Sequence, residues 1–154
     1  MDIKITCFLI ELGCKLFSEF NYKWLAKDIK TNLPLEIDFL NEIKHSDSIK
    51  SLLKLNNVKI PHFHRKYSSK RVLVMDFIEG YSITDVEKIK RDNIDISHIA
   101  KTMAKLFNQM IFEYGIFHAD PHPGNIYIQK LEGENNYNIV LLDHGLYKKL
   151  SKDT

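Results

Sequence analysis

Three side chains near the C-terminus of the sequence have the spacing of a phosphoryl-transfer site. Asp120 precedes Asn125 by five residues within FHADPHPGN (117–125). Asp143 stands two residues before Gly145 within LLDHG (141–145). Phosphoryl transfer needs a carboxylate against the attacking group, together with an amide oxygen and a second carboxylate that hold magnesium on the nucleotide phosphates. The stretch 117–145 therefore predicts a magnesium-dependent site, with Asn125 and Asp143 as metal ligands.

Strands and one helix must position these side chains. Residues 116–118, 125–129 and 138–143 read as strands, so a hairpin would bring Asn125 and Asp143 together at one end. Two oxygen ligands would then converge on one hard cation. Apolar residues repeat every three or four positions from Ile96 to Met110, which predicts a buried helix that ends at Gly115.

The first half of the sequence predicts helices followed by strands. Amphipathic spacing indicates one helix over 8–17 and a short second helix around 24–29. Asn32 as the cap and Pro34 at the first helical position predict a third helix that runs to about residue 55. Segments 58–60, 63–67 and 71–78 then indicate a two- or three-stranded antiparallel sheet, and 82–90 a short polar helix.

Composition excludes several classes of protein. The 154 residues carry 22 basic and 20 acidic side chains, and this balance, with few arginines, argues against a nucleic-acid binder. The longest apolar run near the start, residues 5–10, is too short for a signal-peptide core or a membrane span. Cys7 and Cys14 lie seven residues apart in one expected helix, which is too far for a disulfide.

Four motifs in order resemble the UbiB family of atypical kinase-like proteins, also called aarF-domain-containing kinases. They are LPLEIDFLNE (33–42), RVLVMDFIEG (71–80), FHADPHPGN (117–125) and LLDHGLY (141–147). The resemblance covers nearly the whole chain and is nearest to mitochondrial members of the eukaryotic branch. It implies an α+β protein-kinase-like fold, with an incomplete N-lobe over about 1–80 and the first part of a C-lobe over about 81–154.

The resemblance also implies roles for individual residues. Asp120 is similar to the catalytic-loop aspartate, and Glu42 to the helix glutamate that pairs with a nucleotide-binding lysine. Glu36 and Asp38 match the family's ExD motif near the nucleotide. The segment 75–80 resembles the hinge, which would place four side chains beside adenine: Met75, Asp76, Phe77 and Glu79. ATP and Mg²⁺ are the implied cofactors.

The sequence departs from the family pattern before Glu36. It has no KxGQ segment, no glycine-rich phosphate loop and no strand carrying the nucleotide-binding lysine, and it extends only eleven residues beyond Asp143. We therefore expect an internal fragment of a longer protein, with impaired activity. By resemblance, that protein would be mitochondrial, would act in lipid or ubiquinone metabolism, and would have a lipid or membrane-associated partner.

Three alternatives belong beside the kinase interpretation. The first is a noncatalytic remnant that serves as a binding scaffold. The second is a phosphotransferase similar to aminoglycoside or choline kinases, against which the ExD motif and Asp143-His144-Gly145 argue. The third is an iron site built from His118, Asp120 and a second histidine, His122 or His144. The iron site would leave Asn125 unexplained.

Overall fold

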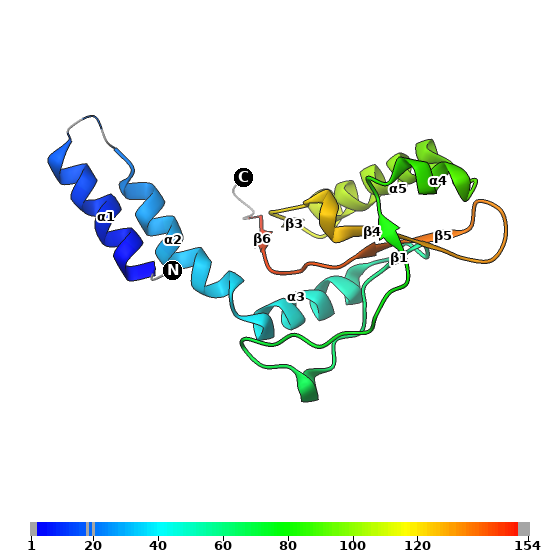
Figure 1. Ribbon diagram of the computed structural model, residues 1–154, viewed down its shortest axis with the longest axis horizontal. Helices are drawn as coiled ribbons and strands as arrows, with labels where there is room; N and C mark the ends of the chain where they lie inside the picture. The colour runs from blue at the N-terminus through cyan, green and yellow to red at the C-terminus, as the bar shows by residue number, and fades with distance from the viewer. Residues whose placement is uncertain (1–2, 18, 20, 151–154) are drawn as a thin grey trace.

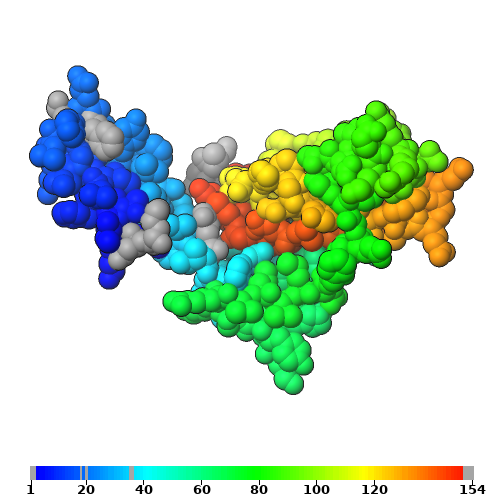
Figure 2. Space-filling view, viewed as in Figure 1, coloured from blue at the N-terminus to red at the C-terminus, as the bar shows by residue number. Residues whose placement is uncertain are grey.

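Three helices make up the first third of the chain: α1 (Ile3–Leu16), α2 (Lys23–Glu36) and α3 (Phe39–Leu52). The structure is a computed structural model that describes residues 3–17, 19 and 21–150, without the side chains of residues 35 and 36. Figures 1 and 2 show α1 and α2 as a hairpin that projects from the rest of the protein. Cys7 and Cys14 are free thiols, as predicted. No helix in the described ranges is long and apolar enough to cross a membrane.

The boundary between α2 and α3 differs from the prediction. Asn32 and Pro34 lie inside α2 instead of starting the third helix, so the expected start at Asn32 is wrong. The helix begins after Asp38, whose backbone is extended and whose carboxylate accepts a hydrogen bond from the Leu40 amide at 3.1 Å. An aspartate in this conformation satisfies an otherwise unpaired amide in the first turn, and this interaction fixes the start of α3.

The predicted antiparallel sheet over 58–78 is present only in part. β1 (Val58–Lys59) pairs in parallel with β5 (Tyr137–Leu141), about eighty residues later in the chain. Residues 65–67 form the short 3₁₀ helix η1 instead of a strand. The segments before and after it pair antiparallel as predicted, through the isolated bridges Phe63 to Met75 and Ser69 to Val72 and through the bond from the His64 amide to the Val74 carbonyl. Because β5 is buried along its whole length, its backbone needs partners on both edges, and β1 supplies one of them.

The second half alternates helices with short strands. In chain order its elements are β2 (Tyr81–Ser82), α4 (Val86–Arg91), α5 (Ile96–Asn108), η2 (Gln109–Glu113), β3 (Ile116–His118), η3 (Pro123–Asn125), β4 (Ile126–Lys130), β5 and β6 (Tyr147–Lys149). The long buried helix is confirmed, and Gly115 follows it with a left-handed φ of +62°. α4 is shorter than the predicted polar helix, because Ser82 belongs to β2 and the helix begins only after Asp85, whose carboxylate accepts from the Lys88 amide.

Two sheets organise these strands. The larger has the order β1-β5-β4-β2, and the smaller pairs β3 with β6. α3 lies on one side of the larger sheet, and α4 and α5 lie on the other (Figure 1). Since β1 belongs to the predicted N-lobe and β5 to the predicted C-lobe, segments of both share one sheet. The lobe boundary near residue 80 stays a prediction.

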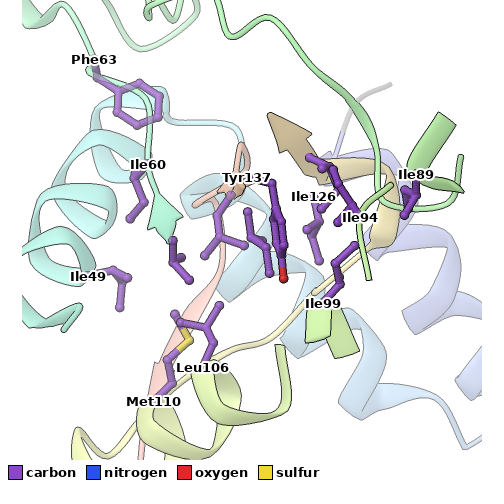
Figure 3. Close-up of a cluster of buried hydrophobic side chains, with 14 of the residues drawn as sticks. Ile49, Ile60, Phe63, Ile89, Ile94, Ile99, Leu106, Met110, Ile126 and Tyr137 are labelled. Atoms are coloured by element: carbon purple, nitrogen blue, oxygen red, sulfur yellow. The ribbon is translucent and has the colours of Figure 1, made fainter. Parts of the chain in front are cut away.

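The core lies between the sheet and the flanking helices. Figure 3 shows isoleucine side chains of α3, α4, α5 and β4 converging with Leu106, Met110 and Tyr137. Leu106, Ile128 and Ile139 are fully buried. Within the β4–β5 hairpin, Ile126 pairs with Leu141, and one step further the Leu142 amide donates to the Asn125 carbonyl at 2.9 Å. The core therefore fixes the register at the end of the hairpin where Asn125 and Asp143 lie.

We predict that Asp38→Ala destabilises the fold by about 1 kcal/mol, because the Leu40 amide loses its acceptor. Asp38→Asn keeps an acceptor oxygen and should retain most of the stability. Chemical denaturation of the two variants measures the difference in the free energy of unfolding. Equal losses in both would show that the capping bond does not stabilise α3.

Leu106→Ala should lower the free energy of unfolding by about 2–5 kcal/mol, because it opens a cavity in the core. Phe112→Ala is the control: Phe112 is 81% exposed, and its truncation should change stability by about 0.5 kcal/mol or less. Denaturant titration compares the two. A Leu106 variant as stable as the Phe112 variant would place Leu106 outside the stabilising core.

Candidate nucleotide and metal site

A cavity of about 560 Å³ lies where α3, the segment around residue 75, the loop after β3 and the loop after β5 meet. Its lining divides by chemistry. The polar lining residues are Glu42, His118, Asp120, Asn125 and Asp143, and the others are Phe39, Leu73, Met75, Leu142, Gly145 and Leu146. Residues from both halves of the chain thus form one site with a set of carboxylate, amide and imidazole groups beside apolar side chains.

Asn125 and Asp143 lie in direct contact. The Asn125 side-chain amide donates to Asp143 Oδ2 at 2.9 Å, and the other carboxylate oxygen accepts from the Gly145 amide at 2.8 Å. Both residues are half-buried, Asn125 just before β4 and Asp143 two residues after β5. This adjacency agrees with the arrangement that the hairpin predicts. A carboxylate and an amide oxygen at one point suit a hard divalent cation such as Mg²⁺.

His118 holds the chain on both sides of the cavity through its ring nitrogens. Nε2 lies 3.1 Å from the Asp143 carbonyl oxygen, so this nitrogen carries the proton and donates. Nδ1 accepts from the Asp120 amide at 3.3 Å. Burial lowers the pKa of His118, opposed by its bond to the Asp143 carbonyl. The neutral Nε2–H tautomer fits both bonds, and the exposed Asp120 carboxylate is left facing the cavity.

The iron-site alternative does not match this geometry. Both ring nitrogens of His118 are engaged with backbone groups. Nδ1 of His122 accepts from the Gly124 amide at 3.1 Å. In the described part of the chain, no group of three or more histidine, cysteine, aspartate or glutamate side chains is arranged to hold a metal ion.

Glu42 is buried and bonds to the loop that carries Asp143. Its Oε1 accepts from the His144 amide at 3.2 Å. Burial raises the pKa of Glu42, the charge of Asp143 adds to the increase, and the bond from His144 opposes it. The family resemblance implies a lysine partner for this glutamate. No lysine lines the cavity in the part of the chain that the structure describes, and the recorded partner of Glu42 is a backbone amide.

His144 is the most buried residue of this loop, at 0% exposure. Its Nε2 donates to the Leu141 carbonyl at 3.2 Å, and its Nδ1 accepts from the Tyr147 hydroxyl at 3.0 Å. The rings of His144 and Tyr147 are stacked, with their centroids 5.8 Å apart. Burial lowers the pKa of His144 to about 4. The ring is therefore neutral at physiological pH, and it does not line the cavity but bonds to the end of β5 and to Tyr147.

The predicted hinge segment reaches the cavity only through Met75. The Asp76 carboxylate lies 2.7 Å from His64 Nε2, Phe77 is 92% exposed, and Glu79 lines a separate hollow beside α4. The Asp76 amide bonds to the His62 carbonyl, which ties the segment to residues 62–64 instead of continuing it along the cavity. A role for this segment in binding a ligand in the cavity therefore rests on Met75.

Asp38 of the ExD motif does not line the cavity. Asp38 caps α3, and its carboxylate lies 3.7 Å from Lys70 Nζ. The side chain of Glu36 lies outside the described part of the structure, so its predicted role stays a prediction. The sequence interpretation missed the apolar half of the cavity. Leu142 and Leu146 flank the Asp143 motif directly, and this position in the sequence could have predicted that they line the cavity. No sequence signal placed Phe39 and Leu73 there.

Comparisons with known proteins identify the family of this chain. The ABC1 atypical kinase-like domain matches residues 1–154. AarF domain-containing kinase 1 of Drosophila melanogaster is 41% identical over 98% of this chain, which spans 29% of that protein. AarF domain-containing protein kinase 1 of Mus musculus is 39% identical over 99% of the chain and 29% of its own length. A probable serine/threonine-protein kinase of Dictyostelium discoideum, abkB, is 36% identical over 89% of the chain, which spans 20% of that protein.

A solved structure shows the same fold. Rv3197 of Mycobacterium tuberculosis, determined as a complex with erythromycin, superposes with a TM-score of 0.72 at 18% sequence identity. The match covers 97% of this chain and 36% of that one. The predicted kinase-like α+β fold is confirmed. The motifs, the domain match and the relatives agree, and the chain belongs to the ABC1 atypical kinase-like family of AarF-domain proteins.

Proposed function

We propose that this chain provides the magnesium- and ATP-binding part of an atypical kinase or ATPase. The observation that carries the proposal is the contact between Asn125 and Asp143, 2.9 Å apart in a cavity with an apolar side. Nucleotides need both an apolar pocket for the base and oxygen ligands for the cation on the phosphates. Family membership supports phosphoryl transfer as the general chemistry.

Each part of the cavity would take a different part of the ligand. Leu73, Met75 and Leu146 supply apolar contacts for the base. The Asn125 amide oxygen and the Asp143 carboxylate would hold Mg²⁺, which when bound neutralises charge on the phosphates. To bind the cation, the Asn125 side chain would turn its oxygen toward it. The hydrogen bond from Asn125 to Asp143 would then be lost, and both side chains would bind the same ion.

Asp120 is the candidate catalytic residue, beside the phosphate group that would be transferred. Its carboxylate is exposed at the cavity, and its amide is fixed by His118 at 3.3 Å. In this position the carboxylate can accept a hydrogen bond from an attacking hydroxyl or water and orient it. The link to lipid or ubiquinone metabolism and the mitochondrial location are part of the proposal and rest on the family resemblance.

One observation favours a second candidate, a noncatalytic domain that binds nucleotide or a partner as a scaffold. The buried carboxylate of Glu42 bonds to the His144 amide, an arrangement that stabilises the loop without a lysine. Such a domain would bind Mg²⁺ and ATP without turnover. Because both candidates bind nucleotide, the rate of ATP hydrolysis separates them.

ATP with Mg²⁺ should raise the thermal midpoint of the purified protein, and Asp143→Asn should abolish the shift. A ligand at a hundredfold excess over its Kd stabilises the native state by about 2.7 kcal/mol. Asp28→Asn, an exposed substitution on α2 with the same charge change, should keep the shift. Equal shifts in the wild type and the Asp143 variant would remove Asp143 from the ligand site.

Asp120→Asn should lower the rate of ATP hydrolysis at least about a hundredfold, because it removes the group that orients the attacking oxygen. Binding of Mg²⁺ and ATP should change little. Phosphate release under saturating nucleotide measures the rate, and the thermal shift measures binding. If the full-length protein binds nucleotide but releases no phosphate, the scaffold candidate replaces the enzyme.

A further inference from the structure

The peptide groups around His144 are held by side chains from two separate elements. His118, at the end of β3, donates from Nε2 to the Asp143 carbonyl at 3.1 Å. Glu42, on α3, accepts from the His144 amide at 3.2 Å. His45, also on α3, places Nδ1 3.1 Å from the His144 carbonyl oxygen. Three successive polar groups of the backbone are thus bonded by three side chains.

The bond from His45 has only one direction. A carbonyl oxygen carries no proton, so Nδ1 of His45 must be the donor. The ring is half-buried and meets the Tyr147 ring edge-on at 5.8 Å, which restricts its rotation. Tyr147 in turn bonds to His144 at 3.0 Å. The imidazole therefore stands between α3 and the loop in a fixed orientation.

Glu42 and His45 act on the same residue from one helix face. They lie three positions apart on α3, which places them on adjacent turns of that face. One holds the N–H of His144 and the other its C=O. The two peptide planes that flank His144 are therefore tied to α3, and the Asp143 side chain leaves the backbone at one of these planes.

We propose that His45 is a positioning residue that fixes Asp143 for metal binding by holding the His144 carbonyl against α3. The proposal deepens the proposed function and rests on it for the identity of the ligand. His45 does not line the cavity itself, so its effect on a ligand passes through the loop. Movement of α3 would then change the affinity of the site for Mg²⁺.

Magnesium titration of ATP binding tests the coupling. His45→Leu removes the donor and should raise the Mg²⁺ concentration at half-maximal ATP binding about tenfold. His45→Asn should restore the wild-type value, because its side-chain N–H can replace Nδ1–H. His62→Leu, which removes an exposed histidine away from the cavity, should leave the value unchanged. Equal values for His45→Leu and wild type, or no rescue by Asn, would overturn the proposal.

A measurement without ligand separates this proposal from the proposed function. Hydrogen exchange followed by NMR should show the amides of His144 and Gly145 exchanging at least about tenfold faster in His45→Leu than in His45→Asn. The amide of Ile128, in the core, should not change. If the wild type binds no ATP but the loop amides respond, the function is wrong and the loop contact stands. If these amides do not respond, His45 does not position the loop.

Discussion

The register of the β4–β5 hairpin is the constraint on which the site depends. Ile126 pairs with Leu141, and fully buried Ile128 and Ile139 pair two residues further along. A shift by one residue would turn each of these side chains to the other face of the sheet, so the core permits a single alignment. That alignment brings Asn125 and Asp143 together, although eighteen residues separate them in the sequence. The site is thus fixed by apolar packing several residues away.

A second set of contacts fixes the conformation of the loop that follows the hairpin. The loop after β5 presents backbone groups to a partly buried space, and leaving such a group unpaired costs about 1–3 kcal/mol. Glu42, His45 and His118 satisfy three of them, and Tyr147 satisfies the His144 ring. Side chains of α3, from the first half of the chain, and His118, at the end of β3, therefore fix the position of the metal-binding loop together. The arrangement links the position of α3 to the chemistry proposed for Asp143.

Local patterns predicted the parts of this structure that depend on neighbours in the sequence. The repeat from Ile96 to Met110 identified α5, and alternating apolar residues identified the hairpin that joins Asn125 to Asp143. Pro34 misled the prediction of α3, because Asp38 offers a carboxylate cap four residues later. The parallel pairing of β1 with β5 joins residues about eighty positions apart, and no local signal carries it. The contacts of His45 and His118 with the loop could not be predicted from the sequence either, because they depend on the conformation of that loop.

A crystal structure with a nonhydrolysable ATP analogue and Mn²⁺ tests the central claim most directly, because manganese replaces magnesium and is located by its anomalous scattering. We predict one strong anomalous peak within bonding distance of the Asn125 side-chain oxygen and the Asp143 carboxylate. The base should lie against Met75 and Leu146, on the apolar side of the cavity. A peak elsewhere, or a nucleotide bound outside this cavity, would contradict the account.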